Sequence, residues 1–248
     1  MARPQRIEIL GVPLDCVDMA QSLDIVDDLI HKKARKPIIA INPEKIIKAR
    51  KDLKLLNFLQ SAGLLIPDGI GAVLAARILF GKKLSRVPGS ELMPAICQRS
   101  VEKGYKIFLL GAAPNVNEKA VDVLEKNYKN IQIVGNQHGY FSKDELPRIV
   151  KTINASGADI LFIALGSPRQ EQWIEENLPK LNIKVCQGVG GTFDVIAGNV
   201  KRAPILFRKI HLEWLYRLLS QPKRLLRQTA LPKFIYLVFR QKVTGNIS

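Results

Sequence analysis

The sequence predicts an α/β protein with a doubly wound, mostly parallel, Rossmann-like sheet and a basic helical appendage at its C-terminal end. Three observations lead to this fold class. Short apolar runs alternate with amphipathic helical patterns, polar and glycine residues follow the apolar runs, and positive charge is concentrated near the C-terminus. Short apolar strands separated by amphipathic helices are typical of a parallel sheet that helices cover on both faces.

The predicted elements alternate along the chain. The apolar runs of strand length are residues 7–10, 37–41, 64–66, 106–110, 131–134, 159–165 and 183–187. The helical patterns between them are residues 19–32, 43–62, 69–80, 90–103, 115–128, 143–155 and 168–177. A chain of 248 residues is long enough for one or two domains.

Composition excludes several classes of protein. A hydrophobic content of 47% excludes a disordered or fibrous chain. The three cysteines form no CxxC pair, which excludes a disulfide scaffold or a cysteine-rich zinc site and indicates a reducing compartment. The net charge of +16 predicts an anionic partner: a nucleic acid, a phosphorylated substrate or an acidic membrane.

No segment predicts secretion or a membrane span. The first ten residues lack the apolar run of a signal peptide. The most apolar stretch, residues 64–80, is interrupted by Asp68 and Arg77, whereas a spanning helix needs ~20 mostly apolar residues. We therefore expect a cytoplasmic protein, or one bound to a membrane face that is reached from the cytoplasm.

The charge divides the chain into a body, residues 1–198, and a tail, residues 199–248. From residue 201 onward there are eleven basic residues and one acidic residue, together with six of the sixteen aromatic residues. A basic amphipathic segment with aromatic side chains is typical of proteins that bind an acidic membrane surface. An ordinary packed helix pair with solvated charges is the alternative interpretation.

Polar and glycine residues follow the strands, at the edge of the sheet where doubly wound folds bind ligands. Asn42, Asp68, Gly111 and the segment 188–191 occupy such positions. Asn42 also suits a helix start, and Asp68 also suits a turn. The segment after Gly111 fits either a strand-to-helix turn or a phosphate site at a helix N-terminus. Three glycines within residues 188–191 favour the close approach of a ligand.

Several sequence patterns are missing. The dinucleotide pattern GxGxxG fails at Phe193 and the phosphate loop GxxxxGK[ST] does not occur, so a dehydrogenase, ATPase or GTPase has little support. No Asp-x-Asp pair occurs, so an enzyme for a nucleotide-sugar would stabilise the leaving diphosphate with helix N-termini and Arg or Lys, without a metal. A nucleic-acid-binding protein is a further alternative, although no helix-turn-helix, RRM or zinc-finger motif is present.

Five motifs together resemble a known family. They are INPEK at 41–45, PDGIG at 67–71, RVPGS at 86–90, GSPRQE at 166–171 and GVGGTFD at 188–194. In this order they resemble the bacterial WecG/TagA/CpsF glycosyltransferases, from about residue 7 to the tail. The resemblance implies a catalytic body that moves a sugar from a UDP-sugar to a polyprenyl-diphosphate-linked acceptor. It implies no cofactor and a peripheral position on the inner face of the bacterial membrane.

The TagA-like branch of the family implies a more specific reaction. N-acetylmannosamine would pass from UDP-N-acetylmannosamine to undecaprenyl-diphospho-N-acetylglucosamine, with inversion and without a metal ion, in wall teichoic acid synthesis. A different UDP-sugar donor, for capsule or exopolysaccharide, is the alternative within the family. We expect no nucleic-acid partner and leave a homo-oligomer open.

The resemblance also implies roles for individual residues. Asp68 would be the general base that deprotonates the acceptor hydroxyl. Asn42, Gln170, Arg86 and Arg169 would bind the substrates.

Further residues would contact UDP and the diphosphates. The residues around UDP would be Gly111, Tyr140, Gly190, Gly191 and Asp194. The tail residues at the membrane or the diphosphates would be Arg217, Arg224 and Arg227. Ala40 stands where many relatives have Thr, so one hydroxyl contact in the donor site is absent.

Overall fold

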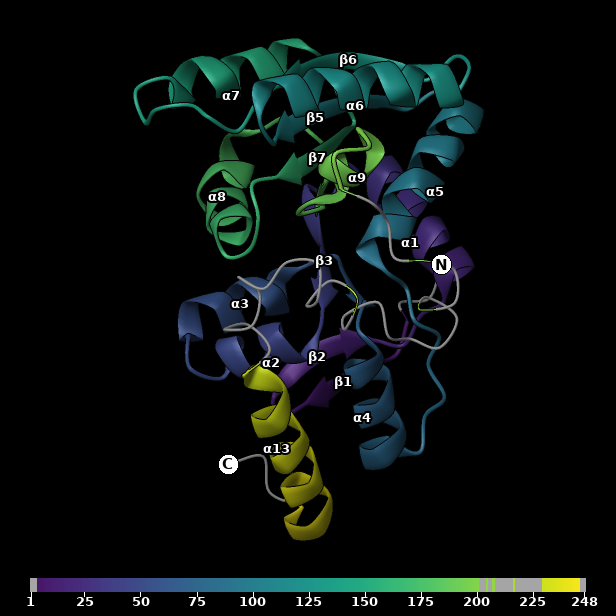
Figure 1. The fold of residues 1–248 in the computed structure, drawn as a ribbon, viewed down its shortest axis with the longest axis vertical. Helices are drawn as coiled ribbons and strands as arrows, with labels where there is room; N and C mark the ends of the chain where they lie inside the picture. Colours follow the sequence, from purple (N-terminus) through teal and green to yellow (C-terminus); the bar gives the residue numbers. More distant parts are fainter. Residues whose placement is uncertain (1–3, 201–203, 205–206, 208–215, 217–228, 246–248) are drawn as a thin grey trace.

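The computed structural model describes residues 4–200, 204, 207, 216 and 229–245. Its centre is a six-stranded sheet in the order β4-β3-β8-β7-β5-β6, in which every neighbouring pair is parallel (Figure 1). The strands are β3 (Lys36–Ile41), β4 (Leu64–Pro67), β5 (Lys106–Gly111), β6 (Gln132–Gln137), β7 (Ile160–Ala164) and β8 (Val185–Gly188). This arrangement confirms the predicted doubly wound α/β fold.

Helices connect these strands. Those before β5 are α1 (Met19–His31), α2 (Pro43–Ala49), α3 (Leu53–Ser61), α4 (Ile70–Phe80) and α5 (Gly89–Lys103). Those after β5 are α6 (Pro114–Asn127), α7 (Leu146–Ala155), α8 (Arg169–Asn177), the short 3₁₀ helix η1 (Leu178–Lys180), α9 (Thr192–Ile196) and α13 (Ala230–Thr244).

Apolar side chains on both faces of the strands explain the two helical layers. In β3, Ile38 belongs to the core on one face and Ile39 to the core on the other, because successive side chains of a strand alternate. Helices α2, α3, α4, α7, α8 and α13 pack on the Ile39 side. Helices α1, α5, α6 and α9 pack on the Ile38 side.

Two predicted elements differ in the structure. The strand expected at residues 7–10 lies outside the main sheet, in an antiparallel hairpin of β1 (Arg6–Ile9) and β2 (Val12–Asp15). Leu10 and Gly11 both have positive φ angles at its turn, as a tight hairpin requires. The helix expected at 43–62 is broken after α2, because Asp52 accepts a hydrogen bond from the backbone of Leu55 and starts α3.

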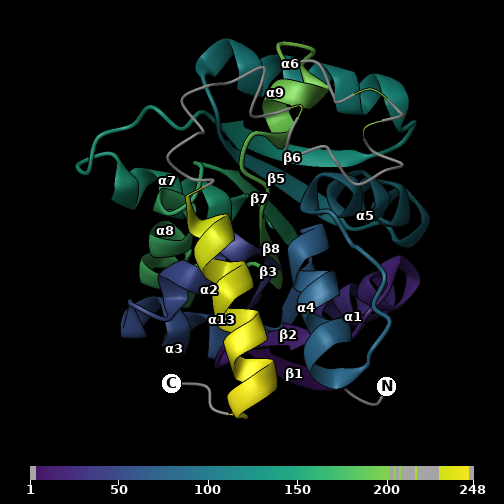
Figure 2. The same ribbon diagram turned by 60° about the horizontal axis from the view of Figure 1, so that its bottom comes forward.

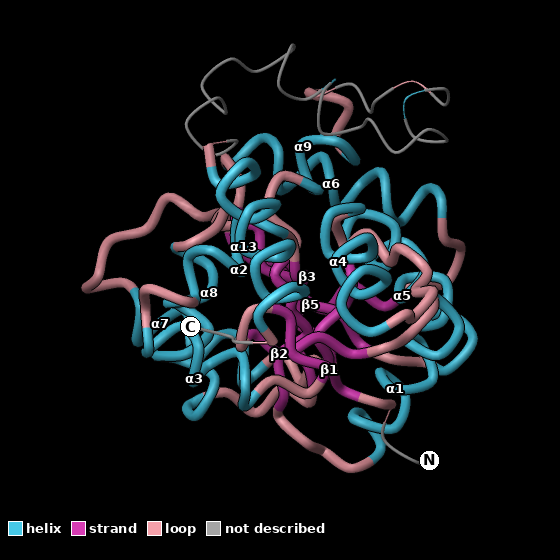
Figure 3. Tube along the Cα trace, turned by 90° about the horizontal axis from the view of Figure 1, so that it is seen from below, coloured by secondary structure: helices cyan, strands magenta, loops and turns pink. Residues whose placement is uncertain are grey.

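Helix α13 is the part of the basic tail that the structure describes as a continuous element. Its Phe234, Leu237 and Val238 are buried in the same core as β1 and β2. Gln241 accepts a hydrogen bond from the backbone of Leu10, at 3.2 Å. Figures 2 and 3 show α13 beside α2 and α4. The predicted boundary at residue 198 remains a prediction, but α13 packs on the body. None of the helices in the described part of the chain is long and apolar enough to cross a bilayer.

Candidate active site

A cavity of about 830 Å³ lies at the carboxyl ends of β3, β4, β7 and β8. The chain leaves β3 toward α2 on one face of the sheet and leaves the neighbouring β8 toward α9 on the opposite face. Adjacent strands whose connections diverge in this way open a crevice between them, which is the usual ligand site of a doubly wound fold. The topology therefore makes this cavity a candidate binding site, at the edge of the sheet where the sequence predicts one.

Asn42 joins β3 to α2 at the edge of this cavity. Its side chain caps the helix, because its Oδ1 accepts a hydrogen bond from the backbone N–H of Lys45 at 2.9 Å. Pro43 occupies the first helical turn, where no intrahelical N–H is needed. The structural interpretation of Asn42 as a helix cap is therefore correct, and the residue also lines the cavity.

Asp68 follows β4 and faces the same cavity. Its Oδ1 accepts a hydrogen bond from the backbone N–H of Gly89 at 2.8 Å, at the start of α5. The neighbouring Gly69 packs closely on Asn42: a Cβ atom at Gly69 would lie 3.3 Å from the Cβ atom of Asn42. The hydrogen bond from Gly89 orients the carboxylate, and the chain that follows Asp68 lies against Asn42. Arg86, which precedes α5, also lines the cavity.

Gln170 holds the glycine-rich loop after β8. It is 5% exposed, and its Oε1 accepts a hydrogen bond from the backbone N–H of Gly190 at 3.1 Å. A Cβ atom at Gly188 would lie only 2.7 Å from the Gln170 Nε2 atom, so the Gln170 amide occupies the space that a side chain would need. Gly190 itself has a φ of +54°, a conformation that favours glycine.

A buried ion pair that the sequence analysis missed supports this loop. Lys45 Nζ lies 2.6 Å from Glu171 Oε1, and the two side chains are 9% and 3% exposed. Gln170 Nε2 also donates to Glu171 Oε1, at 3.2 Å. Burial acts to raise the pKa of Glu171, but the charge of Lys45 and hydrogen bonds from Lys45, Gln170 and Ser167 outweigh it and lower the pKa.

The signal for this pair was present in the sequence. Lys45 and Glu171 each belong to one of the five motifs, beside Asn42 and Gln170 respectively. Because they are 126 residues apart, their contact follows only from the sheet order. The pair links the first turn of α2 to α8, and through Gln170 to the loop after β8.

Six of the ten described candidate residues line one cavity. They are Asn42, Asp68, Arg86, Gln170, Gly190 and Gly191. Asp194 is beside this group, because a Cβ atom at Gly191 would lie 3.8 Å from its Oδ2 atom. The tail candidates Arg217, Arg224 and Arg227 lie outside the described residues.

The other three described candidates lie together, away from the cavity lining. The guanidinium of Arg169 donates to the backbone oxygen of Gly139 at 3.2 Å and lies 5.8 Å from the ring centroid of Phe141. Gly139 packs against Gly111, since a Cβ atom at Gly139 would lie 3.1 Å from the Gly111 Cα atom. Tyr140, in the same loop, is 74% exposed. Their binding roles remain predictions.

Two further features of the site were not predicted. One wall of the cavity is apolar and is formed by α4 and α13. A second cation, Lys48, lines the cavity in addition to the predicted Arg86. Among the described residues, no three His, Cys, Asp or Glu side chains are grouped as ligands for a metal ion.

The comparison with known proteins agrees with this geometry. Residues 7–248 match the Glyco_tran_WecG family, described as the glycosyl transferase WecG/TagA/CpsF family. The match covers nearly the whole chain, so the chain belongs to this family and is a glycosyltransferase of cell-wall or polysaccharide synthesis. The predicted family and enzyme class are therefore confirmed.

Proposed function

We propose that this WecG/TagA/CpsF glycosyltransferase moves N-acetylmannosamine from UDP-N-acetylmannosamine to undecaprenyl-diphospho-N-acetylglucosamine. The proposal rests on the cavity at the end of β3, where Asn42, Asp68 and Gln170 come together. Asp68 is an oriented carboxylate in this cavity, which gives a family member the proton acceptor that a direct displacement needs. The product would be the lipid-linked disaccharide of a wall teichoic acid linkage unit.

Asp68 is the general base in this proposal. Its carboxylate takes the proton of the acceptor hydroxyl as that oxygen attacks C1 of the donor sugar. The new glycosidic C–O bond forms while the bond from C1 to the UDP oxygen breaks, and UDP leaves with the bonding electrons. A single displacement of this kind inverts the anomeric centre. The hydrogen bond from Gly89 N–H orients the carboxylate for this step.

The leaving diphosphate needs positive charge or N–H donors. Arg86 and Lys48 line the cavity and are the proposed contacts in the body. Arg217, Arg224 and Arg227 of the tail are proposed to add to them. No metal ion is required in this scheme, and the wild-type enzyme is expected to keep its activity in excess EDTA.

The donor site is proposed to surround UDP with Gly190, Gly191 and Asp194 on one side. Asp194 has the chemistry to accept a hydrogen bond from a ribose hydroxyl. Tyr140 is proposed to stack on the uracil ring when the donor binds, since its exposed ring has a face available for stacking. Gly111 and Arg169 support the loop that carries Tyr140.

A transfer assay tests the proposal. Purified protein is incubated with a short-chain prenyl-diphospho-N-acetylglucosamine and UDP-N-acetylmannosamine, and released UDP and product mass are measured. A disaccharide-lipid product is the expected result. UDP binding without product from this donor would overturn the donor assignment, and a panel of UDP-sugars would then identify the alternative donor. The Ala40 position, where a hydroxyl contact is absent, makes this panel a necessary control.

Membrane association is tested separately. We propose that the protein sits peripherally on the inner face of the bacterial membrane, because its acceptor is anchored there and its tail is strongly basic. The protein is expected to sediment with acidic liposomes and not with neutral ones. Sedimentation that is equal for both lipid compositions, or absent for both, would contradict an electrostatic attachment.

A further inference from the structure

The cavity of the active site has two chemically different parts. Its polar part contains Asn42, Asp68 and Gln170 at the ends of the strands. Its apolar part lies between α4 and α13, and we call it the α4–α13 groove. The side chains that line this groove are Leu74, Ile78, Leu231, Ile235, Val238 and Phe239. One continuous cavity thus joins a polar site to an apolar channel.

The groove includes apolar helix surface that the fold leaves partly uncovered. On α13, Leu231, Ile235 and Phe239 are spaced four residues apart and therefore share one face. This face adjoins the buried face that carries Phe234 and Val238. Ile235 and Phe239 are 48% and 55% exposed, so large apolar surfaces remain in contact with water along the groove.

The opposite wall shows the same property. Leu74 and Ile78 are one turn apart on α4, and Leu74 is 48% exposed. Neither α4 nor α13 contains an acidic residue. The exposed charged residues on these two helices are all basic: Arg77, Lys233, Arg240 and Lys242. An apolar groove between two helices whose exposed charges are all basic suits a ligand that is apolar along its length and is attached to an anionic surface.

The groove starts directly beside the candidate general base. A Cβ atom at Gly71, three residues after Asp68, would lie 3.7 Å from the Phe234 ring and 2.5 Å from Pro43 Cγ. The ring of Phe234 is thus packed between the starts of α2 and α4. A ligand with its polar end beside Asp68 could continue into the groove past Phe234 without leaving the cavity.

We propose that the α4–α13 groove binds the first isoprene units of the lipid chain of the acceptor. This inference rests on the proposed function, because it assumes a polyprenyl-diphosphate-linked acceptor. The sugar and diphosphate occupy the polar part, and the branched apolar chain lies between Leu74 of α4 and Ile235 and Phe239 of α13. Burial of these side chains favours the lipid-linked acceptor over its water-soluble analogues.

Photo-crosslinking tests the position of the chain without requiring turnover. The full-length protein is irradiated with a farnesyl diphosphate that carries a benzophenone at the end of its chain, and the labelled peptides are identified by mass spectrometry. Labels on α4 and α13 that excess farnesyl diphosphate suppresses are the expected result. Labels only elsewhere would overturn the groove assignment, even if the enzyme transfers sugar to a lipid acceptor.

Kinetics test whether the groove selects the acceptor. Leu74→Gln and Phe239→Gln are compared on two acceptors with the same sugar-diphosphate head and either a farnesyl or a methyl chain. Each variant is expected to raise the KM for the farnesyl acceptor about tenfold, with the KM for the methyl acceptor and for the UDP-sugar unchanged. Val243→Gln is the matched control, because Val243 is on the same helix, is 85% exposed and does not line the cavity.

Three kinetic or physical results would overturn the proposal. Equal loss on both acceptors would mean that the substitutions act through the fold. No loss on either acceptor would mean that the chain lies elsewhere. Sedimentation velocity that shows a dimer for the wild type and monomers for the variants, with KM unchanged, would assign the apolar face to a second copy. Failure of the donor assignment is distinguishable, because it abolishes transfer while suppressible labelling of α4 and α13 persists.

Discussion

Lys45 Nζ of α2 lies 2.6 Å from Glu171 Oε1 of α8, and both of these largely buried residues line the cavity of the candidate active site. The pair connects the helix that Asn42 caps to the residue beside Gln170. Gln170 Nε2 donates a hydrogen bond to Glu171, and Gln170 Oε1 accepts one from the backbone N–H of Gly190. The orientation of the glycine loop therefore depends on this buried charge pair through Gln170.

Removing one partner of this pair should destabilise the protein strongly. Lys45→Met leaves the Glu171 carboxylate buried without its counter-charge, which is expected to cost about 3–5 kcal/mol of unfolding free energy. The double variant Lys45→Met/Glu171→Leu should recover much of this loss, because it removes both charges. Urea denaturation followed by circular dichroism measures all three proteins.

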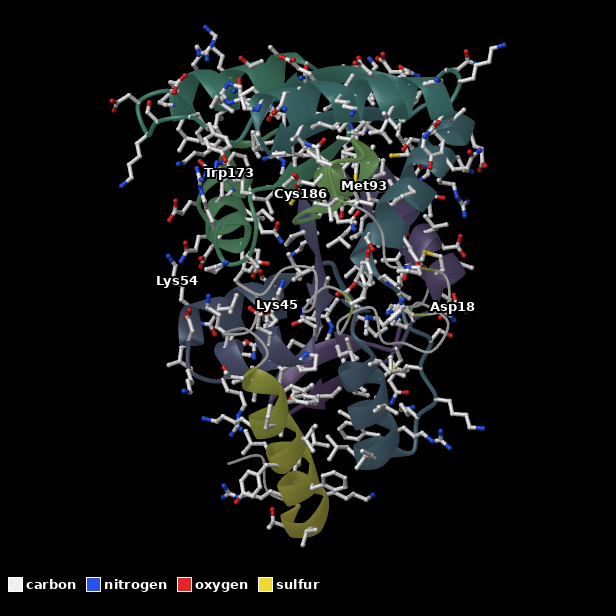
Figure 4. All side chains as sticks on the ribbon, viewed as in Figure 1. Asp18, Lys45, Lys54, Met93, Trp173 and Cys186 are labelled. Carbon is white, nitrogen blue, oxygen red and sulfur yellow. The ribbon has the colours of Figure 1, made fainter. Side chains whose placement is uncertain are left out.

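An exposed ion pair between α3 and α8 is the matched control. Lys54 and Glu175 are 3.6 Å apart, with side chains 66% and 29% exposed. Figure 4 shows Lys54 at the edge of the molecule and Lys45 near its middle. Lys54→Met should cost less than about 1 kcal/mol. Equal costs for Lys45→Met and Lys54→Met would contradict the importance of the buried pair.

The same pair predicts an acid sensitivity. The pKa of Glu171 in the folded protein is below its ordinary value of 4.5, whereas in the unfolded chain it returns to that value. Ionised Glu171 therefore contributes stability that is fully present above pH 4.5 and is lost as the pH falls through the lower, folded-state pKa. The stability difference between wild type and Glu171→Gln should shrink below pH 4.5.

Urea titrations from pH 7 down to pH 3 measure this difference. Glu175→Gln, on the same helix but in the exposed pair, serves as the control for general effects of acid. A wild-type advantage over Glu171→Gln that stays constant across the whole range would show that the carboxylate does not titrate as expected.

The sequence predicts local features of this protein better than contacts between distant segments. The alternation of apolar runs and helical patterns predicts the parallel sheet, and the sheet edge brings Asn42 and Asp68 together as expected. The β1–β2 hairpin was missed, because β2 is four residues long and contains Pro13, which reads as an interruption of a strand. The chain reversal depends on Leu10, whose positive φ is unusual for a branched side chain.

Contacts between segments far apart in the chain explain the remaining misses. The apolar spacing of α13 predicts a helix face but not what that face covers, so the burial of Phe234 beside α2 and α4 required the structure. The cluster of Arg169 with Gly139 likewise depends on how the loop after β6 folds back onto α8. The motifs of a site can be recognised in the sequence, but the order of the strands in the sheet determines which motifs are in contact.

Asp68→Asn should separate catalysis from binding. The asparagine keeps an oxygen for the hydrogen bond from Gly89 N–H but cannot take a proton from the acceptor. We expect turnover to fall by about 10²–10⁴-fold, the usual contribution of a general base, while the affinity for UDP stays within about twofold. Steady-state kinetics and calorimetric UDP titration measure the two effects.

Asp194→Asn is the contrasting variant for this experiment. It lies beside Gly191 and is proposed to contact ribose, so it should weaken UDP binding more than Asp68→Asn does. A loss of UDP affinity in Asp68→Asn, with normal turnover at saturating donor, would assign Asp68 to the donor site and remove it as the base.

Two glycine substitutions distinguish a glycine needed for folding from one needed for the site. Gly111 has a φ of +120°, and a Cβ atom there would lie 2.5 Å from the carbonyl carbon of Ala164. Because backbone strain and overpacking each cost about 1–3 kcal/mol, Gly111→Ala should destabilise the protein by about 3 kcal/mol or more. At Gly188, the added Cβ atom meets the side-chain amide of Gln170, which can move.

Gly188→Ala should therefore cost no more than about 2 kcal/mol in stability but reduce transfer at least tenfold, because the shifted Gln170 amide releases the backbone of Gly190. Thermal denaturation and the transfer assay on both variants separate the two cases. If Gly111→Ala instead keeps its Tm and loses only UDP binding, Gly111 contacts the nucleotide directly. If Gly188→Ala unfolds while Gly111→Ala does not, the roles of the two glycines are reversed, and the loop after β8 is part of the structural core.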